Sequence, residues 1–342
     1  MTIERIVNIF NLKALVKTDF SNSQLSFSDL SETAKDLPYQ EIVNGQIIFG
    51  EFQVIRRISD GPVFLVTNIA ESNSLYAIKI SDRELIFTSK INLRNEYIQH
   101  SMLESKNIVK IHSPLEDQEY FGILMEYVGG GDLADYLKRK KFASVDNALK
   151  IFKSISLALK EVHSKNLVHA DVKPENILLT SNGDFKLADF GLSRDLRFEI
   201  TNDQETNGTL RYLCPDYVTT GHVHKTGDIF SLGIVIYELL TGDIPFSDKD
   251  IMVTLQKRVF ENSPSLKRQV EGIPETFSNI VSKCLEIDLQ KRYKDAKELC
   301  ADLDSLVLKV QKRERSFSTR IRLFKEFPNH RRRRSTIVTQ AA

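Results

Sequence analysis

The chain changes character near residue 129: the segments before it have the pattern of strands, and those after it have the pattern of helices. Between residues 50 and 128, runs rich in Val, Ile, Phe and Tyr are separated by turn-forming runs such as SDG and ESNS, which is typical of antiparallel strands. Strands followed by helices, with a short connection between them, predict two lobes. The segments that we expect to be helical are 83–103, 133–141, 145–165, 226–241, 248–260, 275–285 and 295–311.

The composition is that of a soluble globular protein. The hydrophobic content of 41% and the charged content of 27% are ordinary for that class. The three Cys residues are widely spaced and give neither a zinc pattern nor a disulfide framework, which indicates a reducing compartment. The N-terminal sequence lacks the apolar run of a signal peptide, and no apolar stretch approaches the roughly 20 residues that span a bilayer. We therefore expect a cytoplasmic protein with no transmembrane segment.

The C-terminal tail is strongly basic. Residues 309–342 carry 11 Lys and Arg against two Glu, a formal charge of +9 in a chain whose net charge is +1. The tail has no clear periodicity, and we expect it to be flexible. Its run Arg331–Arg334, followed by Ser335 and Thr336, fits nuclear import through an import receptor, binding to an anionic surface, a phosphorylation site directed by basic residues, or a solvated charge run. We see no aromatic-interleaved platform and expect no specific nucleic-acid binding.

Residues 168–191, VHADVKPENILLTSNGDFKLADFG, combine the groups that phosphoryl transfer needs. Asp171, Lys173 and Asn176 stand at offsets 0, +2 and +5, and Asp189 follows 13 residues after the Asn. An Asp can orient a hydroxyl, and an Asn with a second Asp can hold a divalent metal ion. Each residue alone is also an ordinary loop residue, because Asp caps helices and Asn forms turns. The combination favours phosphoryl transfer.

This stretch resembles the catalytic loop and the metal-binding motif of eukaryotic-type serine/threonine protein kinases, and the resemblance covers some three quarters of the chain. It implies an α+β, two-lobed kinase domain at 49–308. The N-lobe, at 49–128, would be a small antiparallel sheet with one main helix, and the C-lobe, at 129–308, would be larger and helical. Residues 1–48 would form an N-terminal extension and residues 309–342 the basic tail.

The resemblance assigns a role to each residue of the catalytic loop. Asp171 would accept or orient the proton of the substrate hydroxyl, and Lys173 would contact the γ-phosphate of ATP. Asn176 and Asp189 would bind Mg²⁺, which neutralises charge on the transferring phosphate. A Lys at this offset, followed by Pro-Glu-Asn, resembles serine/threonine kinases rather than tyrosine kinases. The alternative is a set of loop caps and turn residues without a catalytic role.

A Lys–Glu pair is expected on the N-lobe side of the ATP site. Lys79 ends the strand-like run YAIK, and Glu96 lies on the next helix. A lone Lys at a strand end is usually solvated, but a partner on the helix would hold it against the α- and β-phosphates. The phosphate-covering loop is weak, because only Gly61 and Val66 match the family's glycine-rich pattern. The residues that the resemblance assigns to ATP are Ile58, Gly61, Val66, Ala77, Lys79, Met125, Glu126, Val128, Asp132 and Leu178.

The connection between the lobes would hold the adenine. The backbones of Glu126 and Val128 would hydrogen-bond the base, and Val66, Ala77 and Leu178 would enclose its ring in the family arrangement. The Asp of the following GGGD sequence would meet the ribose or a basic substrate, although as bare sequence it is also a helix N-cap. Both roles remain open for this residue.

The catalytic loop departs from the family pattern at one position that bears on the activation segment. Ala170 replaces the Arg that binds a phosphorylated activation segment in many kinases. Phosphorylation at Thr201 or Thr206 should therefore not act through that pocket. Thr209, in a GTxxY-like sequence, would hydrogen-bond near the catalytic loop, as in serine/threonine kinases.

Three further positions belong to the structural frame. Asp228 would brace the backbone of the catalytic loop. Asp216 replaces the usual Glu and would form a weaker ion pair with Arg292. His100 stands where the family usually has an apolar side chain, and two interpretations are open: a satisfied, half-buried His, or a polar ring that loosens the active arrangement.

The favoured function is transfer of the γ-phosphate of ATP to Ser or Thr hydroxyls of protein substrates, with Mg²⁺. A weakly active or inactive kinase-fold scaffold that binds protein partners is the alternative. The degenerate glycine loop, His100 and the sequence Cys214-Pro215-Asp216, which replaces the family's Ala-Pro-Glu, favour it. A scaffold has no chemical need for Lys79, Glu96 and the three polar residues of the loop and metal motifs together, which opposes that alternative. Phosphorylation of a small molecule fits less well, because the GTxxY-like segment suits a peptide platform.

Overall fold

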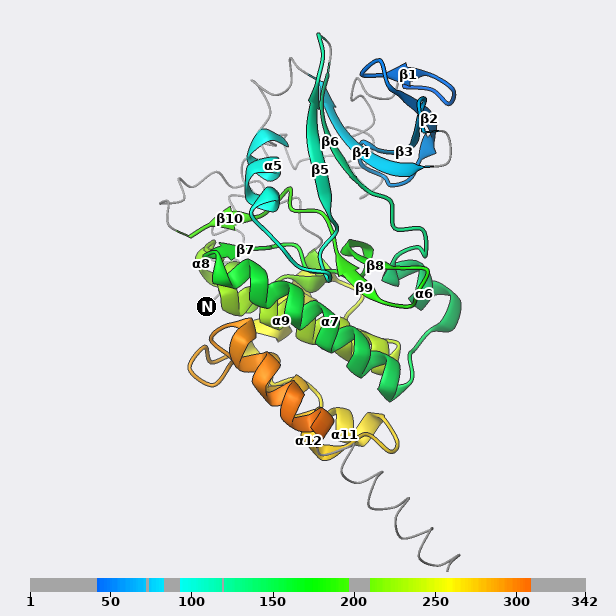
Figure 1. Cartoon of the computed structure of the whole chain (residues 1–342). Coiled ribbons are helices and arrows are strands. Elements are labelled where there is room, and N and C mark those ends of the chain that lie inside the picture. The colour runs from blue at the N-terminus through cyan, green and yellow to red at the C-terminus, as the bar shows by residue number, and fades with distance from the viewer. Residues whose placement is uncertain (1–41, 72–73, 83–92, 119, 197–209, 309–342) are drawn as a thin grey trace, which may run out of the picture.

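The computed structural model describes residues 42–71, 74–82, 93–118, 120–196 and 210–308. A sheet with one helix against it stands above a larger helical body (Figure 1). The prediction of an α+β fold with two lobes is therefore confirmed.

The N-lobe is an antiparallel sheet with the strand order β1-β2-β3-β4-β6-β5. Its hairpins follow from runs of Val, Ile, Phe and Tyr joined by short polar turns. Helix α5 (Leu93–Ser101) packs beside β5 and β6 and carries Glu96. The strands are β1 (Ile47–Ile48), β2 (Phe52–Arg57), β3 (Val63–Asn68), β4 (Leu75–Asp82), β5 (Ile111–Glu116) and β6 (Tyr120–Glu126).

One face of this sheet forms a small apolar core. Successive side chains of a strand point to opposite faces, so alternate residues of β3 and β4 reach the same side. Phe64, Val66, Ile78 and Ile80 are all at most 2% exposed and belong to one buried cluster. Ile42, which precedes β1, packs into the same cluster.

The C-lobe is built around α9, whose sequence is apolar on nearly every side and which lies in the middle of the helical body (Figure 1). Helix α7 crosses it and buries the face with Ile151, Ile155, Leu159 and Val162, at the spacing expected of an amphipathic helix. The helices are α6 (Leu133–Lys140), α7 (Val145–Ser164), α8 (Pro215–Thr220), α9 (Lys225–Thr241), α10 (Ile251–Phe260), α11 (Leu266–Gln269), α12 (Glu275–Cys284) and a helical segment at 296–308.

Short elements between the two lobes carry the sequence motifs. The two-residue and three-residue strands pair as β7 with β10 and β8 with β9, and they hold the catalytic loop and the Asp-Phe-Gly sequence in place. These elements are β7 (Leu167–Val168), η2 (Pro174–Asn176), β8 (Ile177–Leu179), β9 (Phe185–Leu187), β10 (Arg194–Asp195) and η3 (Leu210–Tyr212).

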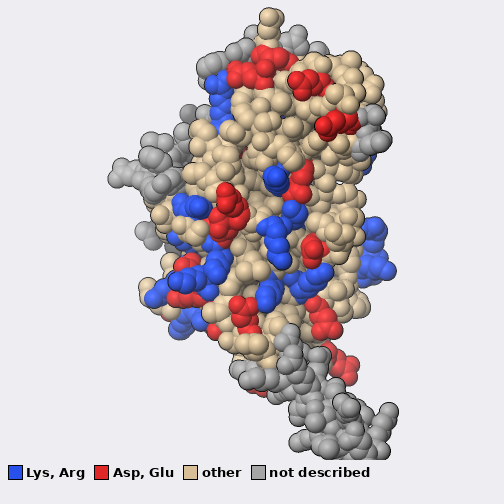
Figure 2. Space-filling model, viewed as in Figure 1, with Lys and Arg blue, Asp and Glu red and all other residues tan. Residues whose placement is uncertain are grey.

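The surface carries charges of both signs. Lys and Arg are most numerous over the lower lobe in Figure 2, and acidic side chains lie among them. Lys150 pairs with Asp184 at 3.6 Å and Lys153 with Asp304 at 2.8 Å. None of the helices in the described ranges combines the length and apolar character that crossing a bilayer requires.

Candidate active site

A single buried carboxylate holds the backbone of the catalytic loop. Ala170 has a φ of 65°, in the left-handed region where residues other than Gly are strained. Asp228, at the start of α9 and 2% exposed, accepts hydrogen bonds from the main-chain N–H groups of His169 (2.9 Å) and Ala170 (2.8 Å). The expected role of Asp228 as a brace for this loop is confirmed. Both bonds go to the main chain and do not involve the side chain at position 170.

Asp228 also links the loop to the far side of the C-lobe. His163, buried on α7, lies with Nε2 2.9 Å from Asp228 Oδ2. The main-chain N–H of Ala296 donates to His163 Nδ1 at 3.1 Å. Because Nδ1 is the acceptor, Nε2 carries the proton and donates to Asp228. Sequence reasoning missed His163, since a His at the end of a helix carries no signal of burial.

The acidic, basic and amide groups of the catalytic loop come together as a cluster. Lys173 Nζ lies 2.8 Å from Asp171 Oδ2. The side-chain nitrogen of Asn176 donates to the same oxygen at 3.0 Å and to the main-chain carbonyl of Asp171 at 2.9 Å. The single turn η2 brings position 176 back beside position 171. Since the amide nitrogen makes both bonds, the side-chain oxygen of Asn176 is the atom that can serve a cation.

Lys79 joins the two lobes. Its ammonium lies 2.7 Å from Glu96 Oε2 on α5 and 2.8 Å from Asp189 Oδ1 in the Asp-Phe-Gly sequence. Burial lowers the pKa of Lys79, but the nearby carboxylates of Glu96 and Asp189 outweigh burial and raise the pKa above its ordinary value. The Lys79 ammonium holds the pKa of Asp189 well below its usual range. A Cβ at Gly191 would lie 3.1 Å from Lys79 Nζ, so this contact favours glycine.

His100 is fully buried in a stack of rings. The ring is 3% exposed, and its centroid lies 4.3 Å from that of Phe190, which in turn lies 4.8 Å from the ring of His169. Nε2 of His100 donates to the main-chain carbonyl of Val109 at 2.7 Å. The residue is therefore a satisfied histidine, and it is more deeply buried than the half-buried environment we expected. Its hydrogen bond ties α5 to the segment before β5.

His100 should make stability depend on pH. Burial lowers its pKa from 6.5 to about 4; the Val109 carbonyl and the more distant Asp189 oppose that shift, and His169 and Lys79 add to it. The unfolded chain therefore binds a proton more tightly than the native chain between these values, and stability falls as the pH falls. We expect this residue to account for about 2 kcal/mol of stability loss between pH 7 and pH 5.

Urea unfolding of wild type and His100→Leu at both pH values measures this effect. The variant loses a hydrogen bond and should be less stable at pH 7, but its stability should fall less on acidification than that of wild type. An equal fall in both proteins would contradict the assignment of this pH dependence to His100.

Val66 does not lie where the sequence pattern put it. In the β3–β4 register Val63 is opposite Lys79 and Leu65 is opposite Ala77, so these side chains share the face that turns toward the C-lobe. Val66 points to the other face and is 0% exposed in the N-lobe core. The expectation that Val66 lines the ATP site with Ala77 is therefore wrong. A one-residue step along a strand reverses the face, and Val63 occupies the corresponding place.

The loop between β2 and β3 is a tight turn. The N–H of Ile58 donates to the Val63 carbonyl at 2.9 Å, which closes the turn around Gly61. Arg57 Nε donates to the carbonyls of Ser59 (3.1 Å) and Gly61 (2.9 Å), and its guanidinium also reaches the Asp60 carbonyl. The Arg57 side chain thus binds three carbonyl groups of the turn. The turn is shorter than a glycine-rich loop that spans a triphosphate.

The connection between the lobes is fixed by close contacts. Glu126 ends β6, with Met125 before it opposite Ala77 in β4, and the Glu126 carboxylate pairs with Lys186. The N–H of Gly130 donates to the Leu179 carbonyl at 2.9 Å, and a Cβ there would lie 2.1 Å from that oxygen, so only glycine fits. Val128 lies in this connection and Leu178 in β8.

Asp132 caps α6. Its Oδ1 accepts from the main-chain N–H of Asp135 at 2.7 Å, which confirms the N-cap interpretation. The residue also pairs with Leu178 through an isolated antiparallel bridge. The cap therefore sits beside the strand that would lie under an adenine ring.

The activation segment is described from residue 210 onward. Thr201, Thr206 and Thr209 lie outside the described residues. Asp216 at the start of α8 forms the expected pair with Arg292: Nη1 lies 2.5 Å from Oδ2, and Nη2 lies 3.3 Å from Oδ1. Both side chains are buried. The Asp216 side chain, although shorter than the usual Glu, thus still makes a two-point contact with Arg292.

The two lobes are joined through Lys79, Glu96 and Asp189. The loop below these residues carries Asp171 and Asn176. This arrangement defines a protein kinase domain. The chain belongs to that family: the model of the protein kinase domain matches residues 52–303. Relatives share this region. Serine/threonine-protein kinase PrkC of Bacillus subtilis is 34% identical over 269 residues, which cover 76% of this chain and 41% of the relative.

Other relatives come from bacteria and from a fungus. The probable serine/threonine-protein kinase PknB of Lactococcus lactis is 30% identical over 267 residues, 76% of this chain and 42% of the relative. Serine/threonine-protein kinase cds1 of Schizosaccharomyces pombe is 31% identical over 267 residues, 72% of this chain and 57% of the relative. The match to this chain thus covers between two fifths and three fifths of the length of these curated relatives.

Proposed function

We propose that the chain is an ATP-dependent protein kinase that transfers the γ-phosphate of ATP to Ser or Thr hydroxyls of protein substrates. The observation that carries this proposal is the contact of Lys79 with Glu96 at 2.7 Å and with Asp189 at 2.8 Å, because it connects both lobes at the place where phosphates would lie. The printed names of the relatives, which are serine/threonine-protein kinases, support the same acceptor class.

Asp171 is the residue that we assign to the substrate hydroxyl. Lys173 and Asn176 hold one carboxylate oxygen, which fixes the orientation of the group. The hydroxyl donates a hydrogen bond to this carboxylate and transfers its proton as the new O–P bond forms and the bond from γ-phosphorus to the β,γ-bridging oxygen breaks, releasing ADP. Lys173 is close enough to Asp171 to stabilise negative charge on the γ-phosphate during this step.

We assign Lys79 to the α- and β-phosphates and Glu96 to its support. Glu96 is 5% exposed and lies on α5, so the distance between Lys79 and the phosphates depends on the position of that helix. His100 on the same helix ties it to Val109. These contacts of Glu96 and His100 attach the helix to β4 and to the segment before β5, and both favour the arrangement that holds the phosphates.

The donor set fits Mg²⁺. Hard divalent cations prefer oxygen ligands, and Asn176 and Asp189 offer an amide oxygen and a carboxylate that is ionised at neutral pH. In the described part of the chain, no group of three or more His, Cys, Asp and Glu gathers, so substrate phosphates would complete the coordination. When bound, Mg²⁺ would neutralise charge on the transferring phosphate.

We place the adenine between the lobes, with the backbones of Glu126 and Val128 as its hydrogen-bond partners. The apolar residues that we assign to its two faces are Ile58, Val63, Ala77, Met125 and Leu178. Val63 takes the place first given to Val66, for the reason of register described above.

We also propose a cytoplasmic location, and a contact of Arg331–Arg334 with an import receptor or an anionic surface. The support for this contact is the charge of +9 on residues 309–342. A fluorescent fusion with these four Arg replaced by Ala would decide whether they direct the chain to the nucleus.

The alternative is a kinase-fold scaffold, and the tight turn around Gly61 favours it, because few N–H groups there could cover phosphates. The test is transfer of radiolabelled phosphate from ATP to dephosphorylated casein in the presence of Mg²⁺. Wild type should label casein on Ser and Thr, and Lys79→Met should reduce the rate by at least about 10²-fold because it removes a charge from the phosphate site.

Lys267→Met is the matched control, since Lys267 is 58% exposed on α11, pairs with Glu275 at 3.0 Å and lies outside the proposed site. It should leave the rate unchanged. Absence of transfer from wild type, despite measurable ATP binding, would reject the kinase proposal in favour of the scaffold.

A further inference from the structure

Arg258 is a buried side chain whose hydrogen bonds within the described residues all go to main-chain carbonyls. It lies on α10 and is 0% exposed. Its Nη1 donates to the carbonyls of Leu210 (3.1 Å) and Leu213 (2.7 Å), and its Nη2 donates to the carbonyl of Arg211 (2.7 Å). One guanidinium therefore gathers three carbonyls of the short segment 210–213.

This cation has no acidic partner in the described part of the chain, and its Nε has no hydrogen-bond partner there either. Burial lowers the pKa of Arg258 to about 10. Taking a guanidinium out of water without a counter-charge is costly. The three carbonyl contacts are what offsets this cost, so the energy of the buried charge depends directly on the shape of 210–213.

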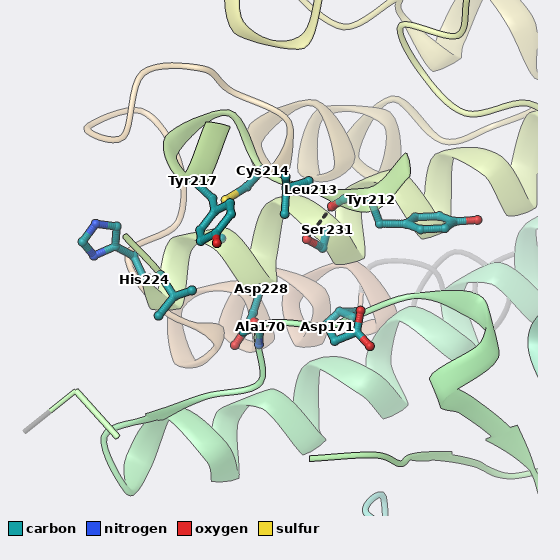
Figure 3. Close-up of a pocket in the computed structure, with 12 residues that line it drawn as sticks. Ala170, Asp171, Tyr212, Leu213, Cys214, Tyr217, His224, Asp228 and Ser231 are labelled. Atoms are coloured by element: carbon teal, nitrogen blue, oxygen red, sulfur yellow. Dashed lines mark hydrogen bonds between the residues drawn. The ribbon is translucent and has the colours of Figure 1, made fainter. Parts of the chain in front are cut away.

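The fourth carbonyl of the segment is also held by a side chain. Ser231 on α9 donates to the main-chain oxygen of Tyr212 at 2.7 Å (Figure 3). The hydroxyl of Tyr212 donates to Glu238, also on α9, at 2.7 Å. All four carbonyls of 210–213 thus accept hydrogen bonds from side chains of α9 or α10. Arg258 donates three of these four bonds, and Ser231 donates the fourth.

The segment faces the catalytic loop. Tyr212, Leu213 and Cys214 line one side of a pocket, and Ala170 and Asp171 line the other (Figure 3). Because Asp171 itself lines this pocket, a protein chain that presents a hydroxyl to Asp171 would lie beside it. The residues next to the acceptor would therefore lie against 210–213.

We propose that Arg258 is a positioning residue for the protein substrate. By holding the carbonyls of 210–213, it sets the shape of the surface against which the substrate chain lies beside the acceptor hydroxyl. The inference rests on the proposed kinase function, and it adds to it a residue outside the motifs, on a helix that touches neither ATP nor the acceptor. A guanidinium suits the task because its planar fork can reach several carbonyls at once.

The experiment compares Arg258→Met and Arg258→Lys with wild type. Met keeps the approximate volume without the charge, and Lys keeps the charge but cannot reach three carbonyls. Both should raise the KM for dephosphorylated casein by about tenfold, while KM for ATP and the rate of ATP hydrolysis without casein change little. Lys257→Met is the matched control, since Lys257 is the preceding residue on α10 and pairs outward with Asp248 at 2.8 Å.

Thermal unfolding identifies variants that fold; if Arg258→Met does not fold, Arg258→Lys carries the test. An unchanged KM for casein in a folded variant, or an equal rise in KM for ATP, would overturn the proposal. Hydrogen exchange of the amides at 210–218 gives a second readout that needs no catalysis. Faster exchange in the variants supports the holding role even if wild type labels no casein, whereas equal exchange rejects it.

Discussion

Replacing Asp171 by Asn should reduce the rate of phosphate transfer to casein by about 10³-fold, because the variant cannot accept the hydroxyl proton. The change is isosteric, and the side-chain oxygen of the new Asn can still accept from Lys173, so the loop should keep its shape. Affinity for ATP should therefore change by less than about threefold. Steady-state kinetics with labelled ATP, together with titration of a fluorescent ATP analogue, separate the two effects.

Asp184→Asn provides the matched control. Asp184 lies between β8 and β9, its side chain is 66% exposed, and it pairs only loosely with Lys150 at 3.6 Å. Its replacement should leave both measurements unchanged. If Asp171→Asn retained more than about a tenth of the wild-type rate, Asp171 would not be the residue that receives the proton.

Replacing Arg292 by Met should lower the free energy of unfolding by about 4 kcal/mol, since it leaves the Asp216 carboxylate buried without its partner. Arg292 also donates to the carbonyls of Glu286 at 2.8 Å and Thr226 at 3.2 Å, and its guanidinium carbon lies 4.9 Å from the centre of the Phe230 ring. The loss thus removes contacts between α8, α9 and the segment after α12. Urea unfolding of the folded domain measures it.

Arg268→Met is the comparison for this second effect, because Arg268 is exposed on α11. It should change stability by less than about 0.5 kcal/mol. A loss below about 1 kcal/mol in Arg292→Met would mean that the buried pair contributes little beyond what a well-packed apolar side chain supplies.

The long elements of the fold were predictable because their patterns are strong. Helix α7 repeats apolar residues at helical spacing over five turns' worth of sequence, and α9 is apolar almost throughout, so both were expected from the sequence. The strands β7 to β10 were not, since segments of two or three residues have no measurable period. Tertiary contacts alone hold them, as in the pairing of Arg194 with Val168.

In the site, the sequence indicated which residues lie together where several of them belong to one short motif. Asp171, Asn176 and Asp189 lie within 19 residues of sequence, and the structure brings the first two into contact. Val66 was misplaced because the turn before β3 is shorter than the family pattern, so matching from the glycines shifted the strand by an odd number of residues. Arg258 could not have been found, because a basic residue on a helix looks solvent-exposed until the neighbouring elements are known.

The hydrogen bonds that run from Ala296 through His163 to Asp228 limit how far the chain can be shortened from its C-terminal side. The first amide of the helical segment 296–308 is part of the support for the left-handed backbone at Ala170. That segment also buries Leu303 completely in the C-lobe core. Removing it would free the ring of His163 and loosen the loop from a distance. A shortened form of the kinase domain should therefore keep this segment at least through Leu306, which is 3% exposed in the same core.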